Sequence, residues 1–71
     1  MLKLSARNQL PGTITGIRKG VTTTHVTIEV APSVIVTAAI TNESAEELRL
    51  AVGGEAVAVI KASDVMVGTK G

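Results

Sequence analysis

The 71-residue sequence predicts an all-β fold, a small five-stranded Greek-key barrel with one short helix, assembled as an oligomer. Three observations lead to this fold class. Runs of β-branched residues recur at strand length between glycine and proline turns, glycines interrupt the first run, and a single helix-start signal follows late in the chain. Because no internal repeat or low-complexity segment divides the chain, we expect one domain over residues 1–71.

The first predicted strand covers residues 10–19 and is bent. Gly12 and Gly16 lie inside this run of β-branched residues, where glycine indicates a bulge or a bend rather than a flat strand. Gly20 then supplies a turn.

The second predicted strand, residues 21–30, alternates between apolar and polar positions. One face carries Val26, Ile28 and Val30, and the other carries Thr23, His25, Thr27 and Glu29. This alternation predicts one buried face and one polar face.

The third predicted strand, residues 34–41, follows a break at residues 31–33 and is apolar on both faces. Such a strand lies at the centre of a sheet or at an interface.

A helix is predicted next, at about residues 45–51. Ser44 and Glu47 match a capping box in which the Ser44 hydroxyl accepts from the Glu47 N–H.

The last two predicted strands follow the glycine pair at residues 53–54. Residues 56–63 are again apolar on both faces until Lys61 interrupts them, and residues 65–67 form a short fifth strand. The tail, residues 68–71, is expected to be loose. Five strands with a bent first strand favour a barrel of the OB type.

The composition excludes several classes of protein. The chain lacks cysteine, phenylalanine, tyrosine and tryptophan, so it has no disulfide, no thiolate zinc site and no ring on which nucleic-acid bases could stack. Seven Lys and Arg residues against six Asp and Glu give a net charge of +1, with no basic patch for nucleic acid or a membrane surface. A core without aromatic residues buries little apolar surface in so small a chain. We therefore expect oligomerisation to bury more apolar surface.

No export or membrane segment follows Met1. The polar run at residues 5–9 comes early, and the longest apolar runs are only strand-sized. We therefore expect a cytoplasmic protein. Met1 directly before residues 2–5 also indicates a free-standing protein rather than a domain cut from a longer chain.

The titratable residues form no catalytic or cation-binding constellation. His25 is the only histidine and Asp64 the only aspartate, and the glutamates have no metal-ligand spacing with either. The simplest interpretation of His25 is an exposed hydrogen bond to Glu29 on the same strand face, in preference to a role as ligand or base. We expect no enzymatic activity, no catalytic residue and no metal-cation site.

Hydrogen-bond donors gather in two segments near the ends of the chain. The first comprises Ser5, Ala6, Arg7 and Asn8, and the second comprises Lys61, Ala62 and Ser63. Convergent donors with one or two positive charges are what an oxyanion requires. The alternative, favoured by composition alone, is that Arg7 and Lys61 are ordinary solvated charges and that Asn8 serves a turn. Because Lys61 interrupts an apolar run, it either extends to solvent or neutralises an anion at a subunit boundary.

A third donor-rich stretch, Lys19-Gly20-Val21-Thr22, lies at a turn. Gly20 there lets backbone amides approach a ligand. Threonine-rich segments are also common in ordinary strands, so this stretch alone does not decide between a site and a turn.

Several segments together resemble the molbindin (Mop) family. They are residues 5–10 (Ser-Ala-Arg-Asn-Gln-Leu) with residues 11–14, residues 36–41, residues 44–48 with Leu50 and the glycine pair 53–54, and residues 58–63 (Ala-Val-Ile-Lys-Ala-Ser). That family comprises small cytoplasmic molybdate-binding proteins, and its domain also occurs at the C-terminal end of molybdate-transporter ATPases and molybdate-responsive regulators. The resemblance covers nearly the whole chain, including the order and spacing of the segments.

The resemblance implies a five-stranded barrel assembled as a hexamer, a trimer of dimers, that binds molybdate and tungstate between subunits. One class of site would use Ser5, Ala6, Arg7 and Asn8 of one subunit with Lys61, Ala62 and Ser63 of another. A second class, near the threefold axis, would use Lys19, Gly20, Val21 and Thr22, mostly through backbone amides. No organic cofactor is implied.

The leading hypothesis is therefore a molybdate-binding protein that serves molybdenum storage and homeostasis. The alternative is an oxyanion-sensing dimerisation module derived from a transporter ATPase or a regulator. Nucleic-acid binding is a third hypothesis, which the missing aromatics and basic groove argue against.

Overall fold

The computed structural model describes residues 4–71 and contains four strands, one α-helix and one 3-10 turn. The strands are β1 (Asn8–Lys19), β2 (Thr23–Ala31), β3 (Val34–Thr41) and β4 (Glu55–Ile60), and the helices are α1 (Asn42–Glu47) and the 3-10 turn η1 (Ala62–Asp64). The interpretation of Met1 as the native start concerns residues outside the described range. Within residues 4–71, no helix is long and apolar enough to cross a membrane.

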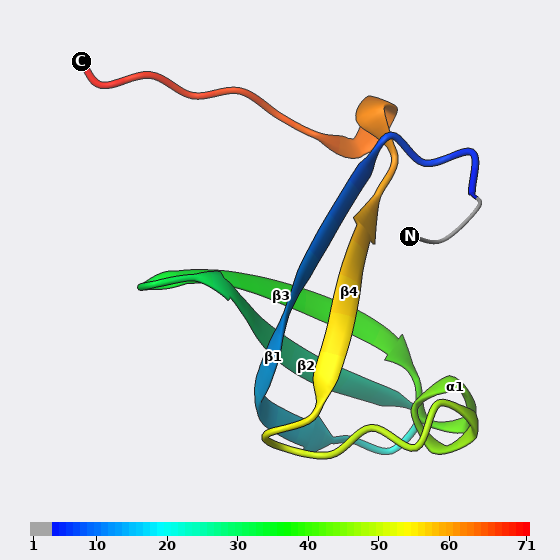
Figure 1. Cartoon of the computed structure of the whole chain (residues 1–71). Helices are drawn as coiled ribbons and strands as arrows, with labels where there is room; N and C mark the ends of the chain where they lie inside the picture. The colour runs from blue at the N-terminus through cyan, green and yellow to red at the C-terminus, as the bar shows by residue number, and fades with distance from the viewer. Residues whose placement is uncertain (1–3) are drawn as a thin grey trace.

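The strands form one antiparallel sheet in the order β3-β2-β1-β4. The first half of β1 pairs with β4 and the second half pairs with β2, so that Thr13 faces Glu55 on one side and Glu29 on the other. A register shift between Ile14 and Gly16 marks a bulge, which confirms the predicted bend. Figure 1 shows the result: the β1–β4 pair crosses over the β2–β3 pair, and the sheet curls toward a barrel.

The curl requires a glycine where β1 approaches β2 most closely. A Cβ on Gly12 would collide with the backbone carbonyl of Glu29 and the side chain of Ile28. Backbone cannot yield as a flexible side chain can, so only glycine fits this position without a shift of the strand.

The core lies inside the curl and is small. Its buried apolar members are Ile14, Val26, Ile28 and Ala58. The predicted alternation of β2 is confirmed, because Val26 and Ile28 are buried while His25 and Glu29 are exposed.

The helix differs from its prediction in both position and cap. Thr41, in extended conformation at the end of β3, is the N-cap residue, and its Oγ1 accepts from the Ser44 N–H at 3.0 Å. The helix therefore begins at Asn42 instead of residue 45, and the predicted bond from the Glu47 N–H to Ser44 is replaced by this earlier cap. It cannot continue to residue 51, since Arg49 has a positive φ of 52°.

The end of the chain also differs from the prediction. Strand β4 stops at Ile60 because the chain turns into η1, where the Asp64 N–H donates to the Lys61 carbonyl at 2.9 Å. The predicted fifth strand at residues 65–67 is wrong for this chain: those residues pair with no strand, and Figure 1 shows the tail projecting away from the sheet. The prediction of a tail without regular structure agrees with residues 68–71.

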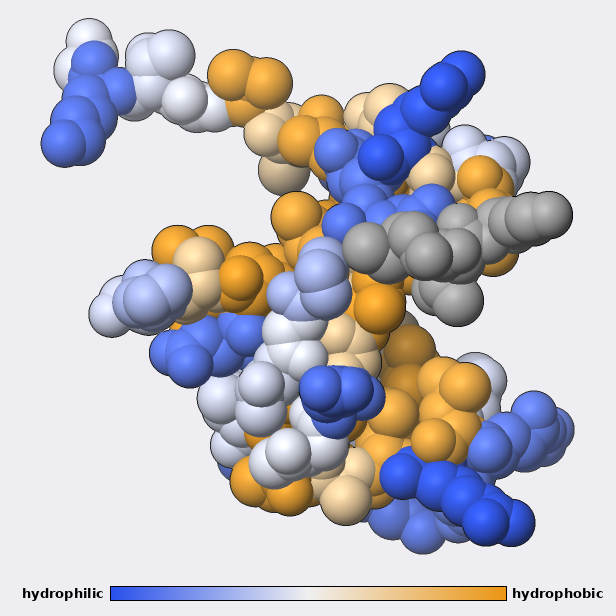
Figure 2. Space-filling model, in the orientation of Figure 1, coloured by the Kyte–Doolittle hydropathy of each residue, from blue (hydrophilic) through white to orange (hydrophobic). Residues whose placement is uncertain are grey.

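The strands that are apolar on both faces, β3 and β4, lie at the two edges of the sheet. A central position for residues 34–41 is therefore wrong, and the interface alternative remains. Figure 2 shows apolar residues on the surface beside these strands and along the projecting tail. The most exposed of them in the tail are Met66 and Val67, at 92% and 90% of their full accessibility.

Candidate functional site

The two donor segments predicted near the chain ends meet at one end of the β1–β4 pair. Asn8 at the start of β1 pairs in register with Ile60 at the end of β4, so residues 5–8 and 61–63 adjoin. The Asn8 side chain fastens the two segments, because its Nδ2 donates to the Ile60 carbonyl oxygen at 3.2 Å. These residues, Ser5, Ala6, Arg7, Asn8, Lys61, Ala62 and Ser63, are called the first cluster below. The sequence prediction takes residues 5–8 from one subunit and residues 61–63 from another, and that division between subunits stays a prediction.

The first cluster is cationic and carries no carboxylate of its own. Over residues 4–71 the one ion pair is between Lys19 and Glu46, so no described carboxylate neutralises Arg7 or Lys61. Both side chains are exposed to solvent, as are the hydroxyls of Ser5 and Ser63. Asp64 borders the cluster in sequence. The arrangement offers charged and neutral donors to an anion, but leaves them open to water in a single chain.

Backbone donors add to the first cluster. In η1 the N–H groups of Asp64 and Val65 are used within the turn, at 2.9 and 3.3 Å from the carbonyls of Lys61 and Ala62. The N–H groups of Ala62 and Ser63 have no acceptor in the described part of the chain. They remain available to a ligand that carries only acceptors.

The third donor stretch forms the turn between β1 and β2, at the opposite end of β1 (Figure 1). Lys19, Gly20, Val21 and Thr22, called the second cluster below, line a surface hollow of about 370 Å³. Arg18 and His25, which lie opposite each other in the β1–β2 register, line the same hollow. The sequence prediction of the second cluster does not include these two residues, although pairing two strands about a turn at Gly20 places them opposite each other.

Lys19 is shared between the second cluster and the helix. Its Nζ lies 3.4 Å from Oε2 of Glu46, and both side chains are largely exposed. An exposed ion pair of this kind contributes only about 0–1 kcal/mol. Lys19 is therefore held loosely, and an anion in the hollow could compete with Glu46 for it.

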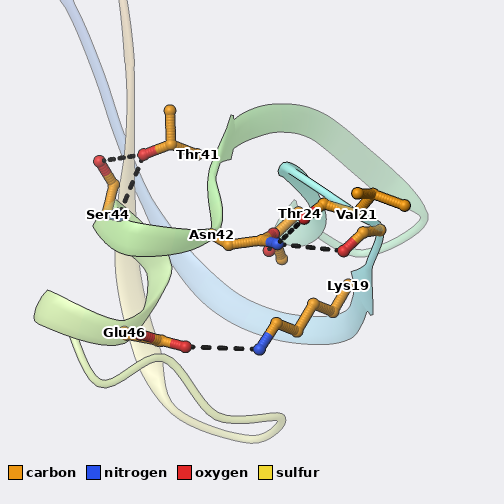
Figure 3. A network of polar contacts seen from close by, with 8 residues as sticks. Lys19, Val21, Thr24, Thr41, Asn42, Ser44 and Glu46 are labelled. Atoms are coloured by element: carbon orange, nitrogen blue, oxygen red, sulfur yellow. Dashed lines mark hydrogen bonds and ion pairs between the residues drawn. The ribbon is translucent and has the colours of Figure 1, made fainter.

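Asn42, the first residue of α1, holds the turn of the second cluster in place (Figure 3). Its Nδ2 donates to the carbonyl oxygens of Gly20 and Val21, at 3.0 Å each, and its Oδ1 accepts from Thr24 Oγ1 at 2.5 Å. The Asn42 backbone N–H donates to the Thr22 carbonyl at 2.9 Å. Asn42 was not predictable as part of this network, since an asparagine at a helix start indicates a local cap and carries no sign of a contact 21 or 22 residues away.

The predicted hydrogen bond between His25 and Glu29 is absent from the described residues. Both side chains lie on the exposed face of β2, as predicted, but four residues along a strand span about 13 Å. The bond is therefore out of reach. His25 instead lies beside the second cluster.

No three His, Asp or Glu residues within positions 4–71 lie close enough to hold a metal ion. The clusters described above consist of hydrogen-bond donors and positive charges. Their chemistry suits an anion whose exposed atoms are all acceptors.

Comparisons with known proteins identify related chains of the same size and larger ones. Residues 4–67 match the TOBE domain family. The chain is 46% identical over 66 residues to molybdenum-pterin-binding protein 1 of Clostridium pasteurianum, which covers 93% of this chain and 97% of that protein. It is 44% identical over 69 residues to the molybdenum transport protein ModE of Azotobacter vinelandii, covering 97% of this chain and 26% of that protein.

A solved structure shares the fold. The structure of ModG, described as a cytoplasmic molybdate-binding protein and solved with molybdate bound, has a TM-score of 0.91 and 40% sequence identity. The match covers 97% of this chain and 49% of the ModG chain. The predicted OB-like fold class is thereby confirmed, with four strands rather than five in the described chain.

Proposed function

Because this chain belongs to the TOBE-domain family and is related to its Mop members, we propose that it binds molybdate, and tungstate as a close analogue, at the two donor clusters. The observation that carries the proposal is the first cluster, where Arg7 and Lys61 directly flank the paired residues Asn8 and Ile60 and no described carboxylate forms an ion pair with either side chain. The molybdate-bound relative ModG supports the choice of ligand.

The chemistry of the ligand matches the chemistry of the clusters. Molybdate is a tetrahedral dianion that carries acceptor oxygens and no donor at neutral pH. The guanidinium of Arg7, the ammonium of Lys61, the Ser63 hydroxyl and free backbone amides can all donate to it. Carboxylates would repel it, and neither cluster contains one.

A site dominated by charged donors and backbone amides also discriminates against hydrogen phosphate. That ion carries a proton, for which the Arg7 guanidinium, the Lys61 ammonium and the backbone amides offer no acceptor. A buried unpaired group costs about 1–3 kcal/mol, which corresponds to roughly tenfold to hundredfold weaker binding. Sulfate is fully deprotonated like molybdate, so its exclusion depends on the size of the closed site.

Closure of the sites requires further copies of the chain, and we assign the protein to a hexamer arranged as a trimer of dimers. Exposed apolar side chains on the tail and at the edges of β3 and β4 support self-association, because monomeric proteins rarely expose contiguous apolar surface. Neighbouring copies would cover this surface and exclude water from the donors. In that assembly the first cluster of one subunit is completed by a second subunit.

We assign to this assembly the storage and homeostasis of molybdenum in the cytoplasm. We expect it to have no enzymatic activity. The near-complete match to molybdenum-pterin-binding protein 1 supports a free-standing binding protein. The match to about a quarter of ModE supports the alternative, an oxyanion-sensing dimerisation module. The two roles differ in what we expect on ligand binding: constant subunit contacts for storage, and subunit contacts that change with the ligand for a sensing module.

Isothermal titration calorimetry with sodium molybdate tests the proposal. We expect saturable binding of molybdate and of tungstate, with phosphate at least about tenfold weaker for the reason given above. Sulfate at the same concentration should not displace the ligand. Absence of binding heat, or equal displacement by sulfate, would contradict the proposal.

A further inference from the structure

We propose that Asn42 is the positioning residue of the second cluster: by holding the carbonyls of Gly20 and Val21, it aims the N–H groups of Val21 and Thr22 at the bound oxyanion. This inference rests on the proposed function and adds to it a residue outside both clusters. Figure 3 shows the arrangement, in which the side chain of Asn42 reaches from α1 to the β1–β2 turn.

The direction of the N–H groups follows from peptide geometry. In a trans peptide the C=O and the N–H of the same peptide group point in opposite directions, and the described peptide bonds are all trans. The Gly20 carbonyl shares its peptide group with the Val21 N–H, and the Val21 carbonyl shares its group with the Thr22 N–H. With both carbonyls held 3.0 Å from Asn42 Nδ2, both N–H groups face away from Asn42.

These N–H groups are free for a ligand. In the described range, residues 4–71, neither the Val21 nor the Thr22 N–H donates to a protein acceptor. Val21 is 98% exposed. Consecutive amides that face the same side are a common device for binding anions. Lys19 and Arg18 supply positive charge in the same hollow.

Asn42 is itself held in one orientation. Its Oδ1 accepts from the hydroxyl of Thr24, a residue only 2% exposed. A flipped amide would place Oδ1 against two carbonyl oxygens and lose both bonds to the turn, so the two carbonyls fix the orientation of the amide. A turn held in this way presents its donors without an ordering penalty when the ligand binds.

The alternative is that Asn42 only stabilises the start of α1. Thr41 provides the control, because its side chain caps the same helix through the Ser44 N–H and has no bond to the turn. Thr41→Val should lower the melting temperature and leave oxyanion binding unchanged. Asn42→Ala removes the three side-chain bonds, and Thr24→Val removes only the bond between the Thr24 hydroxyl and Asn42 Oδ1, which holds the side chain against β2.

The test is an amide-resolved NMR titration of the full chain with sodium molybdate. In the wild-type protein we expect the amides of Val21 and Thr22 to shift with added molybdate, together with those of Ala62 and Ser63 in the first cluster. Asn42→Ala should weaken the response of the turn amides by about tenfold or more, as expected for the loss of aligned donors to an anion. The first-cluster amides should respond as in the wild type, and Thr24→Val should give a smaller loss at the turn.

The outcomes separate this inference from the proposed function. It is overturned if the turn amides of Asn42→Ala respond like the wild type, or if Thr41→Val loses as much response at the turn. It is also overturned if molybdate shifts the first-cluster amides but not those of Val21 and Thr22, a result that leaves the proposed function standing. A spectrum in which neither cluster responds rejects both.

Discussion

Replacing Arg7 by alanine, or Lys61 by alanine, should weaken molybdate binding at the first cluster by roughly tenfold to hundredfold and leave the second cluster unchanged. Each substitution removes a charged donor, and a hydrogen bond to a charged group contributes about 1.5–3 kcal/mol. The clusters lie at opposite ends of β1, so the loss should not spread between them. Calorimetry fitted to two classes of site measures both affinities in one titration.

The matched control for these variants is Arg49→Asn. It also removes one positive charge, it lies outside both clusters, and asparagine adopts the positive φ of 52° found at this position. Its affinities should equal those of the wild type at both clusters. An equal loss of affinity at both clusters in Arg7→Ala or Lys61→Ala would show that the residues are assigned to the wrong site.

Placing a charge on the projecting tail should break the assembly. Met66 is 92% exposed in the single chain, and we propose that a neighbouring copy covers it. Met66→Asp would bury an unpaired carboxylate in that contact, which costs several kcal/mol per subunit unless the contact opens. We expect size-exclusion chromatography with light scattering to report a smaller species than the wild type, with weaker molybdate binding at the clusters.

Thr69→Asp is the control for the tail variant. It introduces the same charge three positions further along, at a residue that is already polar and exposed. It should keep the wild-type mass. A Met66→Asp protein that also keeps the wild-type mass would argue against a role of the tail in assembly.

Local backbone requirements explain which parts of the fold were predictable. Gly12 and Gly16 indicated the bend of the first strand, because a glycine inside a run of β-branched residues is itself a signal of a bulge or a close backbone approach, whichever strand lies opposite. The alternation around Val26 and Ile28 likewise indicated the buried face of β2. The sequence signals of these features are local, although the partners themselves lie on another strand.

Features that depend on distant or competing partners were not predictable in the same way. The helix start was misplaced because Thr41 and Ser44 are both good caps, and the end of β3 decides in favour of Thr41. Residues 65–67 have the composition of a strand, yet pairing requires an edge within reach, and η1 turns the chain away from β4.

The candidate site likewise has a part that was predictable from sequence and a part that was not. The residues of both clusters were identified from a resemblance carried by their sequence, and the antiparallel pairing of β1 with β4 explains why residues 5–8 meet residues 61–63. Asn42 left no sign in the sequence, since its role consists of contacts to carbonyls that any residue provides.

Native mass spectrometry with and without molybdate tests whether the chain forms a molybdate-binding hexamer, because it reports the number of subunits and of bound oxyanions together. We expect a hexamer that gains molybdate when the anion is added and retains the same number of subunits. A monomer, or a hexamer whose mass does not change with molybdate, would contradict this expectation.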